Sequence, residues 1–109
     1  MDVADLQARL RRFAAERDWE RYHAPKNLAM ALAVEAAELA EIFQWSTEEE
    51  SRKAHLDART HERIADEVAD VLLYVLQVAD KCAVDVEAAA RRKLEKNAVK
   101  HPVQGRAGD

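Results

Sequence analysis

Two pairs of acidic residues with helical spacing could carry out chemistry. Glu35 and Glu38 form an ExxE pair, and Glu67 and Asp70 form an ExxD pair after 28 intervening residues. On a helical wheel, Glu35 falls inside the apolar stripe of its segment and Glu38 lies at its edge. Glu67 borders the apolar stripe of the second segment, and Asp70 lies beside it. Because buried carboxylates are costly and repel one another, these acids require compensating cations.

Carboxylate oxygens are the ligands that Mg²⁺ and Mn²⁺ prefer, and these ions also bind substrate phosphates. Salt bridges to arginine or lysine from the first or last helix are a second interpretation, and simple exposure to solvent is a third. A di-iron bundle would need two Glu-x-x-His pairs, whereas the chain has only Glu20/His23, next to Pro25. The four histidines show no HExxH spacing of the zinc hydrolases. A site for Mg²⁺ or Mn²⁺ is the interpretation we favour.

The elements that must position these acids are helices. Alanine, leucine, glutamate and arginine dominate the chain, and it contains two glycines and two prolines, so helix propensity is high nearly throughout. Apolar periodicity predicts an all-α, four-helix bundle-like fold, with Asn27 and Asp85 as helix N-caps and Ser46/Glu49 as a capping box. We expect four main helices and a short connector, at residues 3–17, 27–44, 48–54, 60–81 and 85–100. Residues 1–102 then form one domain, and residues 103–109 form a flexible tail.

Composition excludes several classes of protein. Both glycines lie in the last five residues, which leaves no glycine-rich loop for phosphate. A net charge of −4 argues against a nucleic-acid partner, and no apolar run is long enough for a membrane span. The lone Cys82 and the absence of a signal-like N-terminus favour a cytoplasmic protein. Much of the apolar content is alanine, so the core is modest and we expect completion by a homo-oligomer.

Four segments carry a resemblance to a known family. They are FAAERDWERYHAPKNL, EAAELAEIFQW, DEVADVLLYV and KLEKN, at residues 13–28, 35–45, 66–75 and 93–97. In this order they resemble the all-α nucleoside triphosphate pyrophosphohydrolases, the MazG-like superfamily, and most of all its dCTP pyrophosphatase branch. The resemblance implies a MazG-type fold and hydrolysis between the α- and β-phosphates, releasing a nucleoside monophosphate and pyrophosphate. It also implies that the four acids bind Mg²⁺, for which Mn²⁺ could substitute, and that the protein is a dimer or a tetramer.

Position on the helical wheel and the same resemblance together suggest roles for further residues. Glu38, at the edge of the apolar stripe, is the candidate to accept a proton from the attacking water. The positions that shape the base pocket in this branch are matched here by Trp19, Trp45 and Tyr74. An aromatic ring can stack on a base and contribute about 1–3 kcal/mol. The candidate substrate-binding residues are Trp19, His23, Lys26, Trp45, Tyr74, Lys93 and Asn97. Leu10 stands where better-known eukaryotic relatives have a histidine, which leaves the base preference open.

These inferences lead to one main hypothesis about function and two alternatives. The main hypothesis is a Mg²⁺-dependent enzyme that hydrolyses dCTP, or modified dCTP, to dCMP and pyrophosphate in nucleotide-pool sanitation. The first alternative is a broader house-cleaning pyrophosphatase for noncanonical nucleotides, including dUTP. The second is a noncatalytic helical module whose inward acids pair with arginines of a partner.

Overall fold

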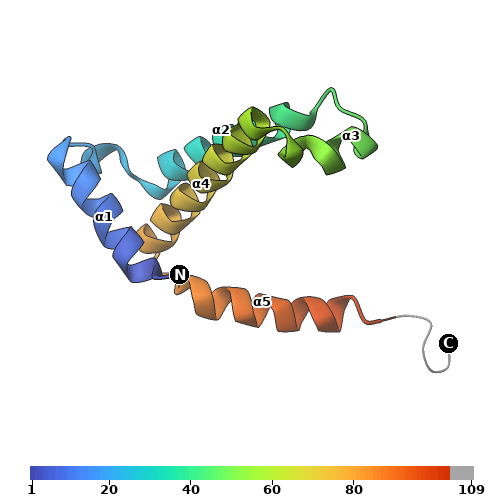
Figure 1. Ribbon diagram of the computed structural model, residues 1–109. Coiled ribbons are helices and arrows are strands. Elements are labelled where there is room, and N and C mark those ends of the chain that lie inside the picture. The colour runs from blue at the N-terminus through green and yellow to red at the C-terminus, as the bar shows by residue number, and fades with distance from the viewer. Residues whose placement is uncertain (104–109) are drawn as a thin grey trace.

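The computed structural model describes residues 1–103, and this part of the chain is helical without strands (Figure 1). It contains five α-helices and two short 3₁₀ helices. The α-helices are α1 (Val3–Glu16), α2 (Pro25–Phe43), α3 (Glu48–Lys53), α4 (Ala58–Lys81) and α5 (Val86–Lys100), and the 3₁₀ helices are η1 (Glu20–Tyr22) and η2 (Ala54–Leu56). The prediction of an all-α fold is confirmed. The predicted tail lies outside the described residues except for Val103, and the domain boundary stays a prediction.

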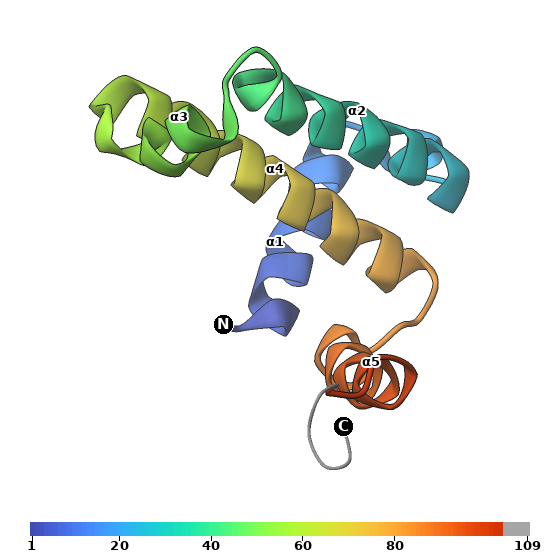
Figure 2. The ribbon, with the colours of Figure 1, turned by 90° about the vertical axis from the view of Figure 1, so that its right-hand side faces the viewer.

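Helices α2 and α4 lie side by side and antiparallel at the centre of the molecule (Figures 1 and 2). Leu28 of α2 and Leu76 of α4 are the largest fully buried side chains. Burial of a leucine side chain contributes about 1.5–3 kcal/mol. These two helices carry both acidic pairs, so their packing determines whether the acids meet.

Helix α1 packs across the C-terminal half of α4. The Gln7 Nε2 atom donates a hydrogen bond to the Leu76 carbonyl oxygen at 2.9 Å. One turn further along α1, an Arg11 guanidinium nitrogen lies 2.7 Å from an Asp80 carboxylate oxygen. These two contacts attach α1 to α4 at a steep angle, which Figure 2 shows.

Helix α2 begins earlier than the sequence analysis predicted. Its first residue is Pro25, after an extended Ala24, because proline suits the first helical position, where its missing N–H is not needed. The prediction that Asn27 caps this helix is wrong. The Asn27 side chain instead donates a hydrogen bond to the Tyr22 carbonyl oxygen at 2.8 Å, which links η1 to the start of α2.

The connector between α2 and α4 is capped one residue later than predicted. Thr47 and Glu50 form the capping box, with the Thr47 N–H donating to a Glu50 carboxylate oxygen at 2.9 Å. The prediction of Ser46 and Glu49 is wrong, because the N-cap is Thr47, which has an extended backbone and whose hydroxyl accepts from the Glu50 N–H at 3.1 Å. The short helix ends at Lys53 and continues as the 3₁₀ helix η2.

The N-termini of the last two α-helices are capped by aspartates. The Asp57 carboxylate accepts from the Thr60 N–H at 2.9 Å, so α4 begins two residues before the predicted residue 60. Asp85 accepts from the Ala88 N–H at 3.0 Å, which confirms the predicted cap of α5. An N-cap of this type contributes roughly 1 kcal/mol.

Two tight turns end α1 and α4 in the same way. Asp18 and Ala83 have positive φ angles of 57° and 54°. In each turn the N–H of the next residue donates back into the helix, from Trp19 to the Ala14 carbonyl oxygen at 2.8 Å and from Val84 to that of Ala79 at 2.9 Å. This is a Schellman motif, which reverses the chain within a few residues. The first turn folds Trp19 back against the end of α1, and the second directs α5 away from α4.

Helix α5 lies apart from the other helices (Figure 2). No residue of α5 is buried, and Leu94 and Val99 are 70% and 83% exposed. The described helices of one chain therefore do not enclose a four-helix core, and completion by a second copy stays a prediction. None of the described helices is long and apolar enough to cross a membrane.

Candidate active site

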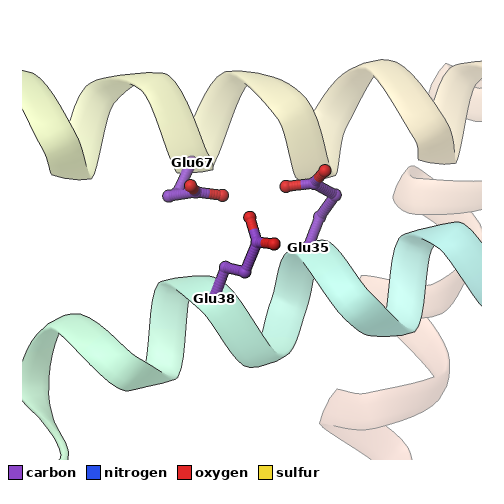
Figure 3. Close-up of side chains that lie close together, drawn as sticks. All are labelled: Glu35, Glu38 and Glu67. Carbon is purple, nitrogen blue, oxygen red and sulfur yellow. The ribbon is translucent and has the colours of Figure 1, made fainter.

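Three of the four predicted acids meet between α2 and α4 (Figure 3). Glu35 and Glu38 lie one turn apart on α2 and point towards α4, and Glu67 points back from α4. One carboxylate oxygen from each of these residues lies within 4.8 Å of the other two. The antiparallel packing of two helices thus gathers residues that are distant in the sequence.

The cluster contains buried oxygens that nothing in the described part of the chain satisfies. The Oε2 atoms of Glu35 and Glu67 are inaccessible to solvent and have no hydrogen-bond partner. Burial is the largest cause that raises the pKa of Glu35 from 4.5 to about 7, and the neighbouring Glu67 and Glu38 carboxyls and the charges of Glu38 and Asp70 contribute in the same direction. A carboxyl group held in this way gains from a nearby cation, because a cation favours its charged form.

Lysine and arginine do not supply that cation within the described residues. Each salt bridge observed there joins other acids: Asp5, Asp18, Glu20, Glu48, Glu49, Asp80 and Glu87. The interpretation that internal salt bridges neutralise the cluster is therefore wrong for residues 1–103. Three carboxylates with two unpartnered buried oxygens form a donor set that fits a hard divalent cation.

Asp70 lies beside this cluster and not within the group of closest oxygens. It is exposed, one turn after Glu67 on α4, and its charge contributes to the raised pKa of Glu35. Asp70 also lines a groove between α1 and α4. It therefore lies at the junction between the acidic cluster and the groove.

The groove has a volume of about 470 Å³ and is largely apolar, with a few polar side chains. Its lining residues are Leu6, Arg9, Leu10, Phe13, Ala14, Trp19, His23, Asp70, Leu73, Tyr74 and Gln77. A concave apolar surface with a small number of polar groups is typical of a small-molecule site. Its position next to the carboxylates suits a ligand with an apolar ring at one end and a negative charge at the other.

Trp19 is held at this groove by its contact with α1. Its ring lies edge-on to the Phe13 ring, with a centroid distance of 5.6 Å and an interplanar angle of 65°. The Arg17 guanidinium covers the Phe13 ring at 3.5 Å. Trp19 is 45% exposed, so part of the indole remains available to a ligand.

The structure brings together some of the predicted substrate-binding residues and separates others. Trp19, His23 and Tyr74 all line the groove. Lys26 lies exposed in the first turn of α2, and Trp45 follows α2 with 90% of its surface exposed. Lys93 and Asn97 are exposed on α5. Within one chain these last four residues lie outside the groove.

The sequence analysis missed several residues of the groove. Leu6 and Phe13 were not among the predicted site residues, although they line the groove from α1. Gln77 was not singled out either. The signal that could have identified Gln77 is its spacing of seven residues from Asp70, which places the two on one face of α4.

Comparisons with known proteins agree with this geometry. The model of the MazG-like family matches residues 30–108. The dCTP pyrophosphatase 1 of Homo sapiens is 41% identical over 101 residues, which cover 93% of this chain and 58% of the relative. The Bos taurus protein of that name is 40% identical over 102 residues, covering 94% and 59%. The chain thus spans about three fifths of the length of these relatives.

A solved structure shows the same fold. A pyrophosphatase from Archaeoglobus fulgidus superimposes with a TM-score of 0.85 at 38% sequence identity, and the match covers 94% of each chain. The family match includes the whole of the acidic cluster and Tyr74. Sequence, fold and the placement of the carboxylates therefore agree that the chain belongs to the MazG-like family.

Proposed function

We propose that this chain is a Mg²⁺-dependent nucleoside triphosphate pyrophosphohydrolase that converts dCTP, or a modified dCTP, to dCMP and pyrophosphate in nucleotide-pool sanitation. The observation that carries the proposal is the cluster of Glu35, Glu38 and Glu67, whose oxygens lie within 4.8 Å of one another. Identities of 40–41% to proteins named dCTP pyrophosphatase 1 support the substrate. We place the activity in the cytoplasm, where nucleotide substrates are present.

The residues of the cluster would hold the cation. Glu35, Glu38 and Glu67 supply carboxylate oxygens, and Asp70 adds a fourth carboxylate at the edge of the groove. A Mg²⁺ ion held there, or Mn²⁺ as a substitute, would neutralise the negative charge of the triphosphate and lower the pKa of the attacking water. Burial of the Glu35 and Glu67 oxygens excludes water from their side of the site.

Side chains of the chain position the substrate and move the proton. Glu38 is partly accessible to solvent at the edge of the cluster, which suits it to accept the proton of the attacking water. The nucleoside would lie along the groove between Trp19 and Tyr74, with His23 beside it. This arrangement directs the phosphates towards Asp70 and the metal-binding cluster.

A homo-oligomer, either a dimer or a tetramer, is the second part of the proposal. The exposed apolar residues Leu94 and Val99 on an otherwise unpacked α5 support it. Lys93 and Asn97 share that helix, so they would reach a nucleotide only across a contact between copies. A solution mass equal to the 12.3 kDa of one chain, measured by light scattering, would contradict this part.

Pyrophosphate release tests the activity directly. A panel of nucleoside triphosphates is assayed with and without Mg²⁺, and we expect the highest kcat/KM for dCTP with Mg²⁺ and no turnover without it. Equal kcat/KM for dUTP and noncanonical triphosphates would favour the broader house-cleaning enzyme. Folded protein that turns over none of them, and whose melting temperature Mg²⁺ leaves unchanged, would favour a noncatalytic helical module.

A further inference from the structure

Three polar residues of α4 follow one another along the wall of the groove. Asp70, Tyr74 and Gln77 have i, i+4 and i+7 spacing, so they share one face of the helix, and all three line the groove. With a rise of 1.5 Å per residue, Gln77 lies about 10 Å along the helix axis from Asp70. Asp70 marks the end of the groove next to the acidic cluster, and Gln77 therefore marks the other end. A nucleoside whose phosphates lie at the cluster extends its base in this direction.

The orientation of the Gln77 amide follows from its hydrogen bond. Its Nε2 atom donates to the main-chain carbonyl oxygen of Leu73 at 3.2 Å. A carbonyl oxygen can only accept, so the nitrogen of the amide must face Leu73. The Oε1 atom therefore points away from this contact, and no donor within residues 1–103 is hydrogen-bonded to it. Gln77 thus offers the groove a half-buried hydrogen-bond acceptor.

The surroundings of Gln77 make this acceptor distinctive. Leu10 of α1 lines the same groove and carries no polar side-chain atom. Arg9 has only donors, and its Nε atom is 3.2 Å from an Asp5 carboxylate oxygen. The Asp70 carboxylate lies two turns away, beside the acidic cluster. Gln77 is the amide among the lining residues and lies near the imidazole of His23, and the fixed orientation of this amide lets it distinguish one base edge from another.

We propose that Gln77 is a specificity-determining residue whose Oε1 atom accepts a hydrogen bond from the exocyclic amino group of the substrate base. This inference rests on the proposed function and concerns the same site. Cytosine presents an amino group where uracil presents a carbonyl oxygen. Because the Gln77 nitrogen is held by Leu73, a uracil carbonyl oxygen would face the Gln77 Oε1 atom. Both atoms are acceptors, so neither would have a hydrogen-bond partner. Gln77 would thus favour dCTP over dUTP.

Substitutions that separate shape from hydrogen bonding test the inference. Gln77→Leu and Gln77→Met remove the acceptor at similar volume, and Gln77→Glu keeps an acceptor oxygen. The readout is the ratio of kcat/KM for dCTP to that for dUTP. We expect the first two variants to lower this ratio about tenfold, the effect of one hydrogen bond of about 1.4 kcal/mol. Gln77→Glu loses the bond to the Leu73 carbonyl oxygen but keeps an acceptor, so we expect it to retain more of the preference for the amino-bearing base than the two acceptor-free variants do.

Gln7→Leu is the matched control. Gln7 also donates its side-chain amide to a carbonyl oxygen of α4, that of Leu76 at 2.9 Å, but it does not line this groove. The control should change stability and leave the substrate ratio as in the wild type. Circular dichroism and the melting temperature identify any variant that fails to fold. If one of the two acceptor-free variants does not fold, the other still tests the inference.

Two results would overturn the inference. One is an unchanged ratio in the folded Gln77→Leu and Gln77→Met variants, and the other is an equal loss of preference in Gln77→Glu. Titration of the wild type with α,β-imido analogues of dCTP and dUTP in the presence of Mg²⁺ separates this inference from the proposed function. Preferential binding of the dCTP analogue without turnover would refute the activity alone, whereas equal binding of both analogues would refute the role of Gln77.

Discussion

Glu35 of α2 and Glu67 of α4 meet with their Oε2 atoms buried, and neither oxygen has a hydrogen-bond partner within the described residues. Like charges in this position oppose the packing of the two helices that bring them together. The burial of Leu28 on α2 and of Leu76 on α4 acts in the opposite direction. The fold thus holds in place a cluster whose electrostatic cost a divalent cation would offset.

Mg²⁺ should stabilise the folded protein. A ligand that binds only the native state adds about 2.7 kcal/mol to the free energy of unfolding at 100 times its dissociation constant. Differential scanning calorimetry with increasing MgCl₂ should show a rising melting temperature, and Glu67→Gln should reduce the rise. Glu41→Gln removes an exposed carboxylate of α2 outside the cluster and should leave the rise intact. A melting temperature that is independent of Mg²⁺ would argue against a cation site.

Without divalent cations, the protein should lose stability as the pH rises through about 7. The pKa of Glu35 is raised to about 7 from its ordinary 4.5, so its protonated form is favoured by the folded chain. This contribution to the free energy of unfolding is complete below pH 4.5 and is lost as pH passes 7. Urea denaturation at pH 6 and pH 8 in EDTA should show the loss, and Glu35→Gln should show a smaller one. Mg²⁺ affinity should rise over the same interval, because the cation binds the ionised carboxylates.

Glu38→Gln should abolish turnover while leaving the fold intact. The variant keeps the shape of the side chain and removes the proton acceptor, and general-base catalysis contributes about 10²–10⁴-fold. Steady-state kinetics should show the loss in kcat, with circular dichroism unchanged. Glu41→Gln, one turn further along α2, is the matched control and should retain full activity. Wild-type turnover in Glu38→Gln would remove Glu38 from the mechanism.

Trp19 should act on substrate binding through KM. A base stacked on the indole gains about 1–3 kcal/mol, so Trp19→Ala should raise KM roughly 5- to 150-fold. Phe13→Leu keeps an apolar side chain at the groove but removes the edge-on contact that holds Trp19, worth about 0.5–1.5 kcal/mol, and should have a smaller effect. Tyr22→Leu removes an exposed aromatic ring outside the groove and should leave KM unchanged. A KM that responds equally to Tyr22→Leu and Trp19→Ala would contradict a stacking role.

Ala83→Gly should stabilise the protein. Ala83 has a φ angle of 54°, a conformation that costs a residue with a Cβ atom about 1–2 kcal/mol and glycine almost nothing. A gain of 1 kcal/mol would raise the melting temperature by about 4–8 °C in a domain of this size. Ala90→Gly, within α5, should have the opposite sign, because glycine is unfavourable inside a helix. A lower melting temperature for Ala83→Gly would contradict the assignment of strain to this turn.

Local features of the sequence predicted much of the secondary structure. The all-α class and the Asp85 cap follow from side chains that act on their own segment of the chain. The wrong N-cap predictions at Asn27 and Ser46 are also local errors, because several neighbouring polar residues can cap the same free N–H groups of a helix. The helix boundaries therefore shifted by about one turn or less, and the helices themselves were predicted correctly.

The sequence by itself determined that Glu35 and Glu38 share one helix face and that Glu67 and Asp70 nearly share another, because helical periodicity depends only on spacing. Which of these faces meet depends on how α2, α4 and α1 cross, and long-range packing decides that. The family resemblance implied that the four acids bind Mg²⁺, but only the tertiary structure showed that Glu67 meets the α2 pair directly and that Asp70 lies at the groove. The tertiary structure also placed Trp19 and Gln77 at that groove and left Trp45 apart from it. No local pattern contains these relationships, since each is the result of contacts between segments that are distant in the chain.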